Sequence, residues 1–252
     1  MELYGLLGKT LKHSFSGDYF GKKFAKKGIK AEYHLFEFDE VPDLHAFAKD
    51  NPSLKGFNVT IPYKRTVVAQ LDEMSNLVRM TGNANVVKVV RKNGNIKLVG
   101  YNTDATGFEK SLEPLVKKRN NLRALILGTG GAAHTVAFVL RKMGIYFYFV
   151  TRNPYKVEMI GYSFITPEII NECQLIVNTT PVGMFPEMDA CPNIPYENLD
   201  SSHILYDLVY NPPETLFLKK GKEKGATIKN GQEMLQIQAE ESWKIWNNKS
   251  GF

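Results

Sequence analysis

The stretch Arg123-Ala-Leu-Ile-Leu-Gly128-Thr-Gly130-Gly131-Ala-Ala133 is the strongest indication of the fold class of this chain. It reads as a short apolar strand that runs into a G-x-G-x-x-A turn, and apolar residues at helical spacing follow it. In such a turn Gly128 permits the sharp bend, Gly130 lets the backbone approach a pyrophosphate, and Ala133 is small enough for close helix–strand packing. The helix that starts there would point its amide groups and the positive end of its dipole at the phosphates.

Downstream of this turn the chain alternates strands with helices. We expect strands at Ile145–Val150, Leu175–Val177 and His203–Asp207. Strands that alternate with helical patterns favour a parallel sheet covered by helices. The sequence therefore predicts a Rossmann-type domain over 104–230, which opens with a polar helix at about Thr106–Leu115.

Upstream, a second α/β pattern predicts a separate domain over 1–103, with a mostly parallel sheet. Expected strands are Leu3–Leu7, Glu32–Phe38, Gly56–Thr60, Ala84–Arg91 and Ile96–Tyr101, and expected helices are Ser16–Gly28, Val41–Asn51 and Leu71–Arg79. The segment Lys92-Asn93-Gly94-Asn95 has the Asn-Gly pair that favours a tight hairpin between the last two strands.

The residues after the second Rossmann strand bear on the choice of cofactor. A site for NAD usually places Asp or Glu about 20 residues past the glycines, where the carboxylate binds the ribose hydroxyls. This chain instead has Thr151-Arg152-Asn153-Pro154-Tyr155-Lys156. Arg152 can stack on adenine and bind a phosphate, and Lys156 adds a second positive charge. The segment favours NADP; two solvated basic residues after a strand are the alternative.

Three further segments are rich in small polar residues where core strands should end. They are Lys12–Ser16, Gly56–Lys64 and Gly100–Asp104. Polar residues at strand ends suit a hydroxylated ligand in an α/β crevice. Each segment could also be ordinary capping or turn chemistry.

The length, composition and net charge of the chain limit the classes of protein to which it can belong. The 252 residues suit one large domain or two modest ones, and no apolar stretch of about 18 residues indicates a membrane helix. The N-terminus does not resemble a signal peptide, and two cysteines are too few for a disulfide framework, so we expect a cytoplasmic protein. No Cys/His cluster has metal-ligand spacing, so no metal is expected. The net charge of +6 comes from scattered lysines without a nucleic-acid-binding motif, so no nucleic-acid or membrane partner is expected.

Taken together, these motifs resemble the shikimate dehydrogenase family, in the family's order and over almost the whole chain. The resemblance extends to Asn178-Thr-Thr-Pro181-Val-Gly183-Met184, Asp207-Leu-Val-Tyr210-Asn-Pro and Asn230-Gly231-Gln-Glu-Met-Leu-Gln-Ile-Gln238-Ala. It implies NADPH-dependent reduction of 3-dehydroshikimate to shikimate, in the chorismate pathway of aromatic amino acid biosynthesis. It also implies that a final helix, Gly231–Asn247, packs back with 231–252 on the first domain. Leu235, Ala239, Trp243 and Trp246 form one apolar stripe on that helix.

The resemblance also implies roles for individual residues. Ser14 and Ser16 would bind the substrate carboxylate, and Lys64 with Asp104 would form the catalytic pair. The residues implied to bind ring hydroxyls are Thr60, Asn85, Asp104 and Gln238, with help from Tyr210. The residues implied to bind NADP are Gly128, Thr129, Gly130, Gly131, Ala132, Thr151, Arg152, Lys156, Leu208 and Gly231.

The chemistry of the reaction supports the catalytic pair independently. Hydride delivery to a ketone builds negative charge on the oxygen, so a cation and a proton donor beside that oxygen lower the barrier. Lys64 can supply both, and Asp104 within reach would orient it. Desolvation would lower the pKa of the lysine while the carboxylate would raise it, and the sequence does not tell which effect dominates.

Departures from the family pattern leave substrate choice open. Gly17 replaces the usual proline after the second serine, Val86 replaces a threonine, and Thr151 replaces an asparagine. The alternatives are an enzyme for quinate, for both substrates or for aminated analogues, and a non-catalytic NADP-binding sensor. His13 could be proposed as an acid–base group, although nothing places it at the reacting carbon. The oligomeric state, monomer or homodimer, is not readable from the sequence.

Overall fold

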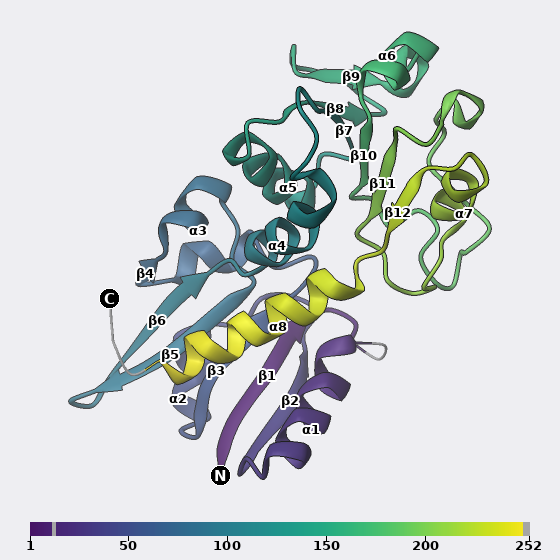
Figure 1. Cartoon of the computed structure of the whole chain (residues 1–252). Coiled ribbons are helices and arrows are strands. Elements are labelled where there is room, and N and C mark those ends of the chain that lie inside the picture. Colours follow the sequence, from purple (N-terminus) through teal and green to yellow (C-terminus); the bar gives the residue numbers. More distant parts are fainter. Residues whose placement is uncertain (12–13, 249–252) are drawn as a thin grey trace. The chain divides into compact units, whose positions relative to one another are not determined.

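The computed structural model describes residues 1–11 and 14–248, so His13 and the last four residues of 231–252 lie outside the described residues. The chain divides into two compact units: Met1–Thr103 together with the chain from Gln238 on, and Asp104–Ile237. Each unit has its own six-stranded sheet (Figure 1). The division falls inside the C-terminal helix α8 (Gln232–Asn247), whose residues from Gln238 on belong to the first unit.

The first unit is built on a sheet with the strand order β2-β1-β3-β5-β6-β4. Strands β1, β2 and β3 are parallel, β5 runs antiparallel to both neighbours, and β4 is parallel to β6. The strands are β1 (Glu2–Gly8), β2 (Ala31–Glu37), β3 (Leu54–Val59), β4 (Glu73–Met74), β5 (Val86–Lys92) and β6 (Asn95–Tyr101). The helices are α1 (Phe15–Lys27), α2 (Leu44–Asp50), the 3₁₀ turn η1 (Thr66–Gln70) and α3 (Asn76–Thr81).

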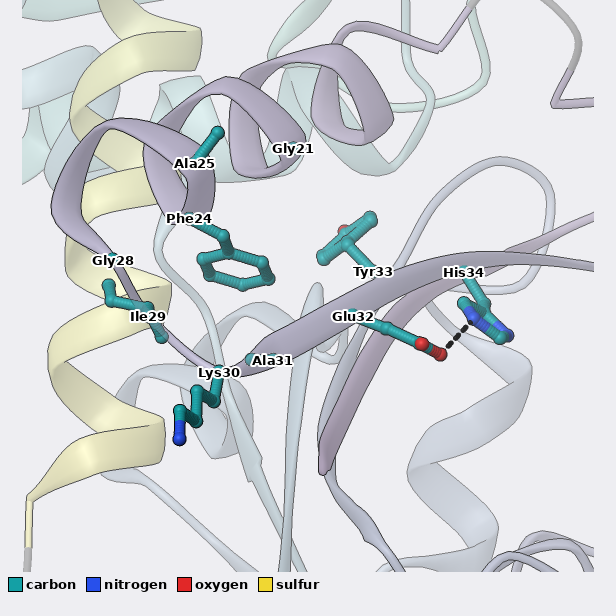
Figure 2. Close-up of a pocket in the computed structure, with 10 residues that line it drawn as sticks. All are labelled: Gly21, Phe24, Ala25, Gly28, Ile29, Lys30, Ala31, Glu32, Tyr33 and His34. Atoms are coloured by element: carbon teal, nitrogen blue, oxygen red, sulfur yellow. Dashed lines mark hydrogen bonds and ion pairs between the residues drawn. The ribbon is translucent and has the colours of Figure 1, made fainter.

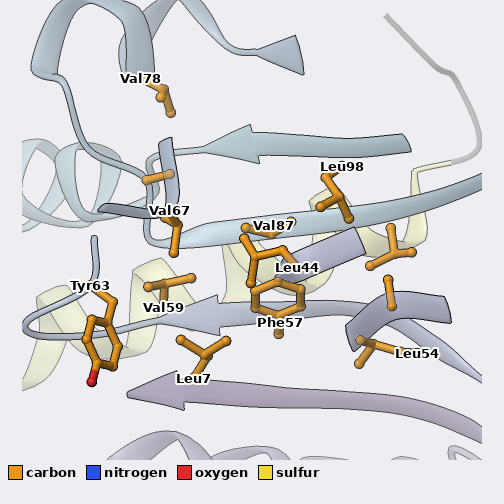
Figure 3. Close-up of a cluster of buried hydrophobic side chains, with 13 residues drawn as sticks. Leu7, Leu44, Leu54, Phe57, Val59, Tyr63, Val67, Val78, Val87 and Leu98 are labelled. Carbon is orange, nitrogen blue, oxygen red and sulfur yellow. The ribbon is translucent and has the colours of Figure 1, made fainter. Parts of the chain in front are cut away.

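The two faces of this sheet carry different cores. Because side chains alternate along a strand, Tyr4 points to the face that α1 and α8 cover, where it packs with Phe20 and Trp246. Leu7 and Phe57 point to the opposite face, where they join Leu44 of α2 in a second apolar cluster, which Figure 3 shows. Both clusters are apolar, and burial of their surface stabilises the unit.

One element expected from the sequence is wrong. The segment Leu71–Arg79 does not form one helix, because Glu73 and Met74 pair with β6 and form β4, the edge strand of the sheet. The Asp72 carboxylate accepts a hydrogen bond from the Leu98 amide at 2.6 Å, which fastens the segment to that edge. Ser75 then caps the shorter helix α3, so this stretch contains a strand and a helix start within a few residues.

The predicted hairpin between β5 and β6 is confirmed. Asn93 and Gly94 have φ angles of 51° and 76°, the left-handed values that a tight hairpin turn demands of both central residues.

The second unit has a fully parallel sheet with the order β12-β11-β10-β7-β8-β9. Numbered from β7, the order is 3-2-1-4-5-6, the Rossmann arrangement, and its direction reverses between β7 and β10. The strands are β7 (Arg123–Leu127), β8 (Tyr146–Thr151), β9 (Met159–Gly161), β10 (Leu175–Asn178), β11 (Ile204–Asp207) and β12 (Thr227–Lys229). The helices are α4 (Asp104–Val116), α5 (Gly131–Lys142), α6 (Pro167–Glu172) and α7 (Leu216–Glu223), with the 3₁₀ turns η2 (Tyr162–Phe164) and η3 (Tyr196–Asn198).

The two-unit α/β architecture with a Rossmann-type second sheet confirms the fold class expected from the sequence. Within the second unit Phe108 of α4 packs edge-on against Tyr206 of β11, and Ser111 hydrogen-bonds the phenol of Tyr206 at 2.6 Å. In the part of the chain that the structure describes, no helix is long and apolar enough to cross a membrane.

Candidate active site

The N-terminus of α1 carries the two serines predicted to bind a carboxylate. Ser14 is the N-cap, and its hydroxyl accepts a hydrogen bond from the Ser16 amide at 3.2 Å. Farther along the helix, Lys23 is almost completely buried and forms an ion pair with Glu240 of α8 at 2.5 Å. Helix α1 is therefore capped at its N-terminus and bonded to α8 farther along. The positive end of the helix dipole at this N-terminus is favourable for an anion.

Strand β3 leads to Thr60 and Lys64. Thr60 follows the last residue of β3, and its amide donates to the Leu7 carbonyl at 3.0 Å. Tyr63 is buried and donates to the Phe38 carbonyl at 2.7 Å, which anchors the turn. Lys64 is half-buried, and its carbonyl accepts from the Ala84 amide at 2.8 Å. That bond sets Lys64 beside the segment that carries Asn85.

Asn85 and Gln238, predicted to bind ring hydroxyls, meet in a buried polar cluster of the first unit. The Asn85 Oδ1 atom accepts from the Thr103 amide at 2.7 Å, which fixes the orientation of the carboxamide because a backbone amide can only donate. The Asn85 Nδ2 atom then faces Gln238 Oε1 at 3.4 Å and Thr103 Oγ1 at 3.0 Å. Asn85 and Gln238 are 2% and 5% exposed, so these amides are held in place rather than solvated.

Sequence reasoning assigned no role to four members of this cluster, which are Tyr33, Asn58, Thr103 and Ser242. Asn58 of β3 donates to Ser242 Oγ at 3.0 Å and accepts from the Tyr33 hydroxyl at 2.9 Å, while Ser242 and Thr103 hydroxyls lie 3.2 Å apart. Burial raises the pKa of Tyr33 well above its usual value, so its hydroxyl remains a donor. Two signals could have indicated these residues: Asn58 occupies the polar face of an alternating strand, and Ser242 lies one helical turn after Gln238.

The predicted catalytic pair is divided between the units. Lys64 belongs to the first unit, and Asp104 opens α4 in the second, directly after Thr103. Tyr210 also belongs to the second unit, in the segment after β11. The joint action of Lys64 and Asp104 therefore stays a prediction.

The glycine turn after β7 lies where the strand order of the second sheet reverses. Gly128 has a φ of 111°, and a Cβ atom there would lie 2.8 Å from the Thr179 hydroxyl, so both conformation and space require glycine. At Gly130, the N-cap of α5, and at Gly131, no described residue beyond the local backbone comes within 4 Å of the place that a Cβ atom would occupy, so packing does not require glycine there. The open space over these two residues fits the close approach of a pyrophosphate to the helix start.

The other residues predicted to bind the cofactor lie in the same unit. Thr129 and Ala132 are half-buried in the glycine turn. A Cβ atom on Gly231 would lie 2.2 Å from the Leu208 carbonyl oxygen, and the Gly231 amide donates to Val209 at 3.1 Å, so Leu208 and Gly231 are packed together.

The basic residues predicted to select NADP follow β8. Thr151 is the last residue of β8, and its hydroxyl accepts from the Asn153 amide at 3.4 Å. Arg152 and Lys156 are exposed, and the Lys156 ammonium lies 5.7 Å from the centre of the Tyr155 ring. Burial raises the pKa of Tyr162, and the positive charge of Arg152 partly offsets that rise. Both cations are accessible to a phosphate.

A separate hollow of about 580 Å³ lies between α1 and β2. Figure 2 shows its lining, which includes Phe24, Ile29 and Lys30 and a hydrogen bond between Glu32 and His34 of 2.9 Å. None of the residues predicted from the sequence to bind a ligand lines it. The hollow is widely open to solvent, unlike the concave sites that usually bind small molecules, so it is not the candidate site.

The reversed strand order and the glycine turn place the second unit in the Rossmann class of dinucleotide-binding folds. Comparison with known proteins gives the family. Residues 6–87 match the family model of the shikimate dehydrogenase substrate binding domain. The NADP(+) shikimate dehydrogenase of Caldicellulosiruptor saccharolyticus is 39% identical, over 96% of this chain and 90% of the relative. The corresponding protein of Aquifex aeolicus is 36% identical, over 98% and 91%. The chain belongs to the shikimate dehydrogenase family.

A solved structure agrees with this assignment. Shikimate 5-dehydrogenase from Thermus thermophilus, in complex with NADP(H) and shikimate, superposes with a TM-score of 0.83 at 30% identity. The match covers 98% of this chain and 94% of that one. The family resemblance predicted from the sequence is thereby confirmed.

Proposed function

We propose that this protein catalyses the reversible reduction of 3-dehydroshikimate to shikimate with NADPH, in aromatic amino acid biosynthesis. The observation that carries the proposal is the buried cluster of Asn85, Thr103 and Gln238 in a chain of this family. Buried amides and hydroxyls at fixed orientation are suited to a ligand with several hydroxyl groups, because each such group needs a matched partner. The names of the relatives, which are NADP(+) shikimate dehydrogenases, support the same cofactor and substrate.

In this proposal each unit has its own task. The first, 1–103 with 231–252, binds the substrate, and 104–230 binds the cofactor. Ser14 and Ser16 at the start of α1 bind the ring carboxylate. Thr60, Asn85, Gln238 and Tyr210 bind the ring hydroxyls, together with Asp104.

Lys64 and Asp104 perform the proton chemistry. As the carbonyl oxygen gains charge, the Lys64 ammonium stabilises it and donates a proton, and Asp104 orients the lysine. In the reverse direction a neutral Lys64 accepts the hydroxyl proton. The half-buried position of Lys64 excludes part of the solvent, which strengthens its interaction with a developing oxyanion.

The glycine turn and its neighbours fit NADP. Gly128, Thr129, Gly130, Gly131 and Ala132 would hold the pyrophosphate, since Gly130 and Gly131 leave space over the start of α5. Thr151, Arg152 and Lys156 would bind the adenosine 2′-phosphate, and Leu208 with Gly231 would line the nicotinamide side. When bound, the cofactor supplies the hydride.

The test is a kinetic assay of the purified protein with shikimate or quinate, each with NADP or NAD, followed by the absorbance of the reduced nicotinamide. Turnover mainly of shikimate with NADP supports the proposal. Turnover of quinate, or a higher kcat/KM with NAD, would retain the chemistry and overturn the specificity. No turnover in any of the four combinations, with NADPH still bound, would overturn the assigned reaction in favour of a sensor or an enzyme for another analogue.

Two further expectations belong to this proposal. We infer a cytoplasmic location, because the substrate and NADPH are metabolites of that compartment, and a monomer or homodimer in solution. Fractionation of the source cells and light scattering of the purified protein test these two points.

A further inference from the structure

Asp207, the last residue of β11, is a buried carboxylate to which the proposed chemistry assigns no role. Its side chain is 0% exposed, and three segments donate hydrogen bonds to it. Asn178 Nδ2 and the Val209 amide each donate to Oδ1 at 3.0 Å, and the Thr215 hydroxyl donates to Oδ2 at 2.6 Å. A buried carboxylate is costly unless its oxygens are bonded, so this arrangement is a specific one.

One of these bonds leads towards the glycine turn. Asn178 ends β10, and its Oδ1 atom accepts from the Thr180 amide at 3.1 Å and from the Thr180 hydroxyl at 2.6 Å. Thr180 Cγ2 lies 3.0 Å from the place that a Cβ atom on Gly128 would occupy. The carboxylate of Asp207 thus orients Asn178, and Asn178 orients the loop that packs on the glycine turn.

A second bond sets the turn after β11. The Oδ1 atom of Asp207 accepts from the Val209 amide, and this bond turns the backbone directly after the end of β11. The Val209 carbonyl accepts from the Gly231 amide at 3.1 Å, and Gly231 packs on the Leu208 carbonyl. The position of Leu208 and Gly231, both predicted to bind the cofactor, therefore depends on the Asp207 carboxylate.

The third bond holds the following helix. Thr215 is completely buried and caps α7, and its hydroxyl also accepts from the Leu218 amide at 3.4 Å. Asp207 consequently connects the ends of β10 and β11 with the start of α7, all at the carboxyl edge of the parallel sheet. Ligands of open α/β sheets bind at this edge.

We propose that Asp207 is a positioning residue for the dinucleotide: without contacting it, the carboxylate holds the loops after β10 and β11 in the arrangement that binds NADPH. This inference rests on the proposed function in its choice of cofactor. A carboxylate suits the role because both of its oxygens accept and charge-assisted hydrogen bonds are stronger than neutral ones. Asparagine has nearly the same shape and can retain the three contacts, since the Thr215 hydroxyl can accept instead of donate.

The test compares NADPH binding, measured by titration of nicotinamide fluorescence, in the wild type, Asp207→Ala and Asp207→Asn. We expect about a tenfold or larger rise in Kd for Asp207→Ala, because several hydrogen bonds that fix the loops are lost. Asp207→Asn should restore Kd to within about threefold of the wild type. In turnover assays the KM for NADPH should rise in Asp207→Ala more than kcat falls at saturating NADPH.

Asp200→Ala is the matched control, because Asp200 lies before the other end of β11 and bonds Ser202 and His203 there. It removes a carboxylate network of the same unit without touching the loops of the site. An unchanged Kd in folded Asp207→Ala, or an equal rise in Asp200→Ala, would overturn the inference.

If Asp207→Ala does not fold, Thr215→Val carries the test, because it keeps the shape and removes one of the three bonds, together with the cap that Thr215 provides to α7. A rise in Kd of about threefold is then expected, and an unchanged value would refute the role. Since binding is measured without turnover, a wild type that binds NADPH but does not reduce 3-dehydroshikimate would contradict the proposed reaction alone.

Discussion

Replacing Asp207 by asparagine should change how the stability of the protein depends on pH. Burial raises the pKa of Asp207 from 3.8 to about 6, against the opposing effect of hydrogen bonds from Thr215, Val209 and Asn178. Between these two values the folded protein retains a proton that the unfolded chain has lost. Stability therefore falls as the pH rises through this window, and it is recovered below about pH 4.

The size of this effect follows from the shift. A difference of about 2 pKa units corresponds to about 3 kcal/mol, since one unit is worth about 1.4 kcal/mol. Asparagine at this position binds no proton in either state. The wild type should lose about 3 kcal/mol of unfolding free energy relative to Asp207→Asn between pH 4 and pH 6, and no more above that range.

Urea unfolding followed by circular dichroism at several pH values measures the difference between the two proteins. Comparing them at each pH cancels the titration of all other groups. Asp200→Asn is a control of opposite sign, because hydrogen bonding by Ser202 lowers the pKa of the exposed Asp200, whose stabilisation is lost as the pH falls. If the difference in unfolding free energy between the wild type and Asp207→Asn stays constant from pH 4 to pH 6, burial does not raise the pKa of Asp207 as described.

Three further predictions concern the proposed site and the fold. Lys64→Ala should lower kcat by about two orders of magnitude or more in the shikimate assay, and a loss of only a few-fold would reduce Lys64 to a binding role. Arg152→Ala should raise the KM for NADP and leave the higher KM for NAD nearly unchanged. Equal effects on both KM values would contradict recognition of the 2′-phosphate by Arg152. Gly56→Ala should destabilise the protein by about 1–3 kcal/mol in urea, because the new methyl group would lie 2.4 Å from the Trp246 indole and 2.6 Å from the Val87 carbonyl. An unchanged unfolding midpoint would mean that α8 is not packed on β3 as described.

Local physics explains why much of the fold was predictable from the sequence. The positive φ of Gly128 and the open space over Gly130 and Gly131 are what glycine itself permits, so the turn can be recognised from the local sequence. The Asn93-Gly94 hairpin is predictable for the same reason. The segment Leu71–Arg79 was mispredicted because its strand exists only through pairing with β6, in which each residue contacts one 26 positions away, as Glu73 does Val99.

The residues of the candidate site likewise fall into two groups, those that local sequence predicts and those that only the fold brings together. Ser14 and Lys64 could be named from motifs, since their neighbours in sequence carry the signal. The sequence offers a signal for Asn58 and for Ser242 separately. Their pairing could not be predicted, because they are 184 residues apart and become partners only when α8 lies on β3. From the sequence, Asp207 could be recognised only as the first residue of a family motif. Its burial and its three hydrogen bonds arise because three different segments surround it in the folded protein.

Residue order was sufficient to establish the class of sheet, the position of the glycine turn and the family to which the chain belongs, because these depend on short-range pattern and residue type. The strand orders, the buried cluster around Asn85 and the environment of Asp207 became visible only in the folded molecule. Those features arise from hydrogen bonds and packing between distant segments, whose free energy is realised only when the chain has folded and water is excluded.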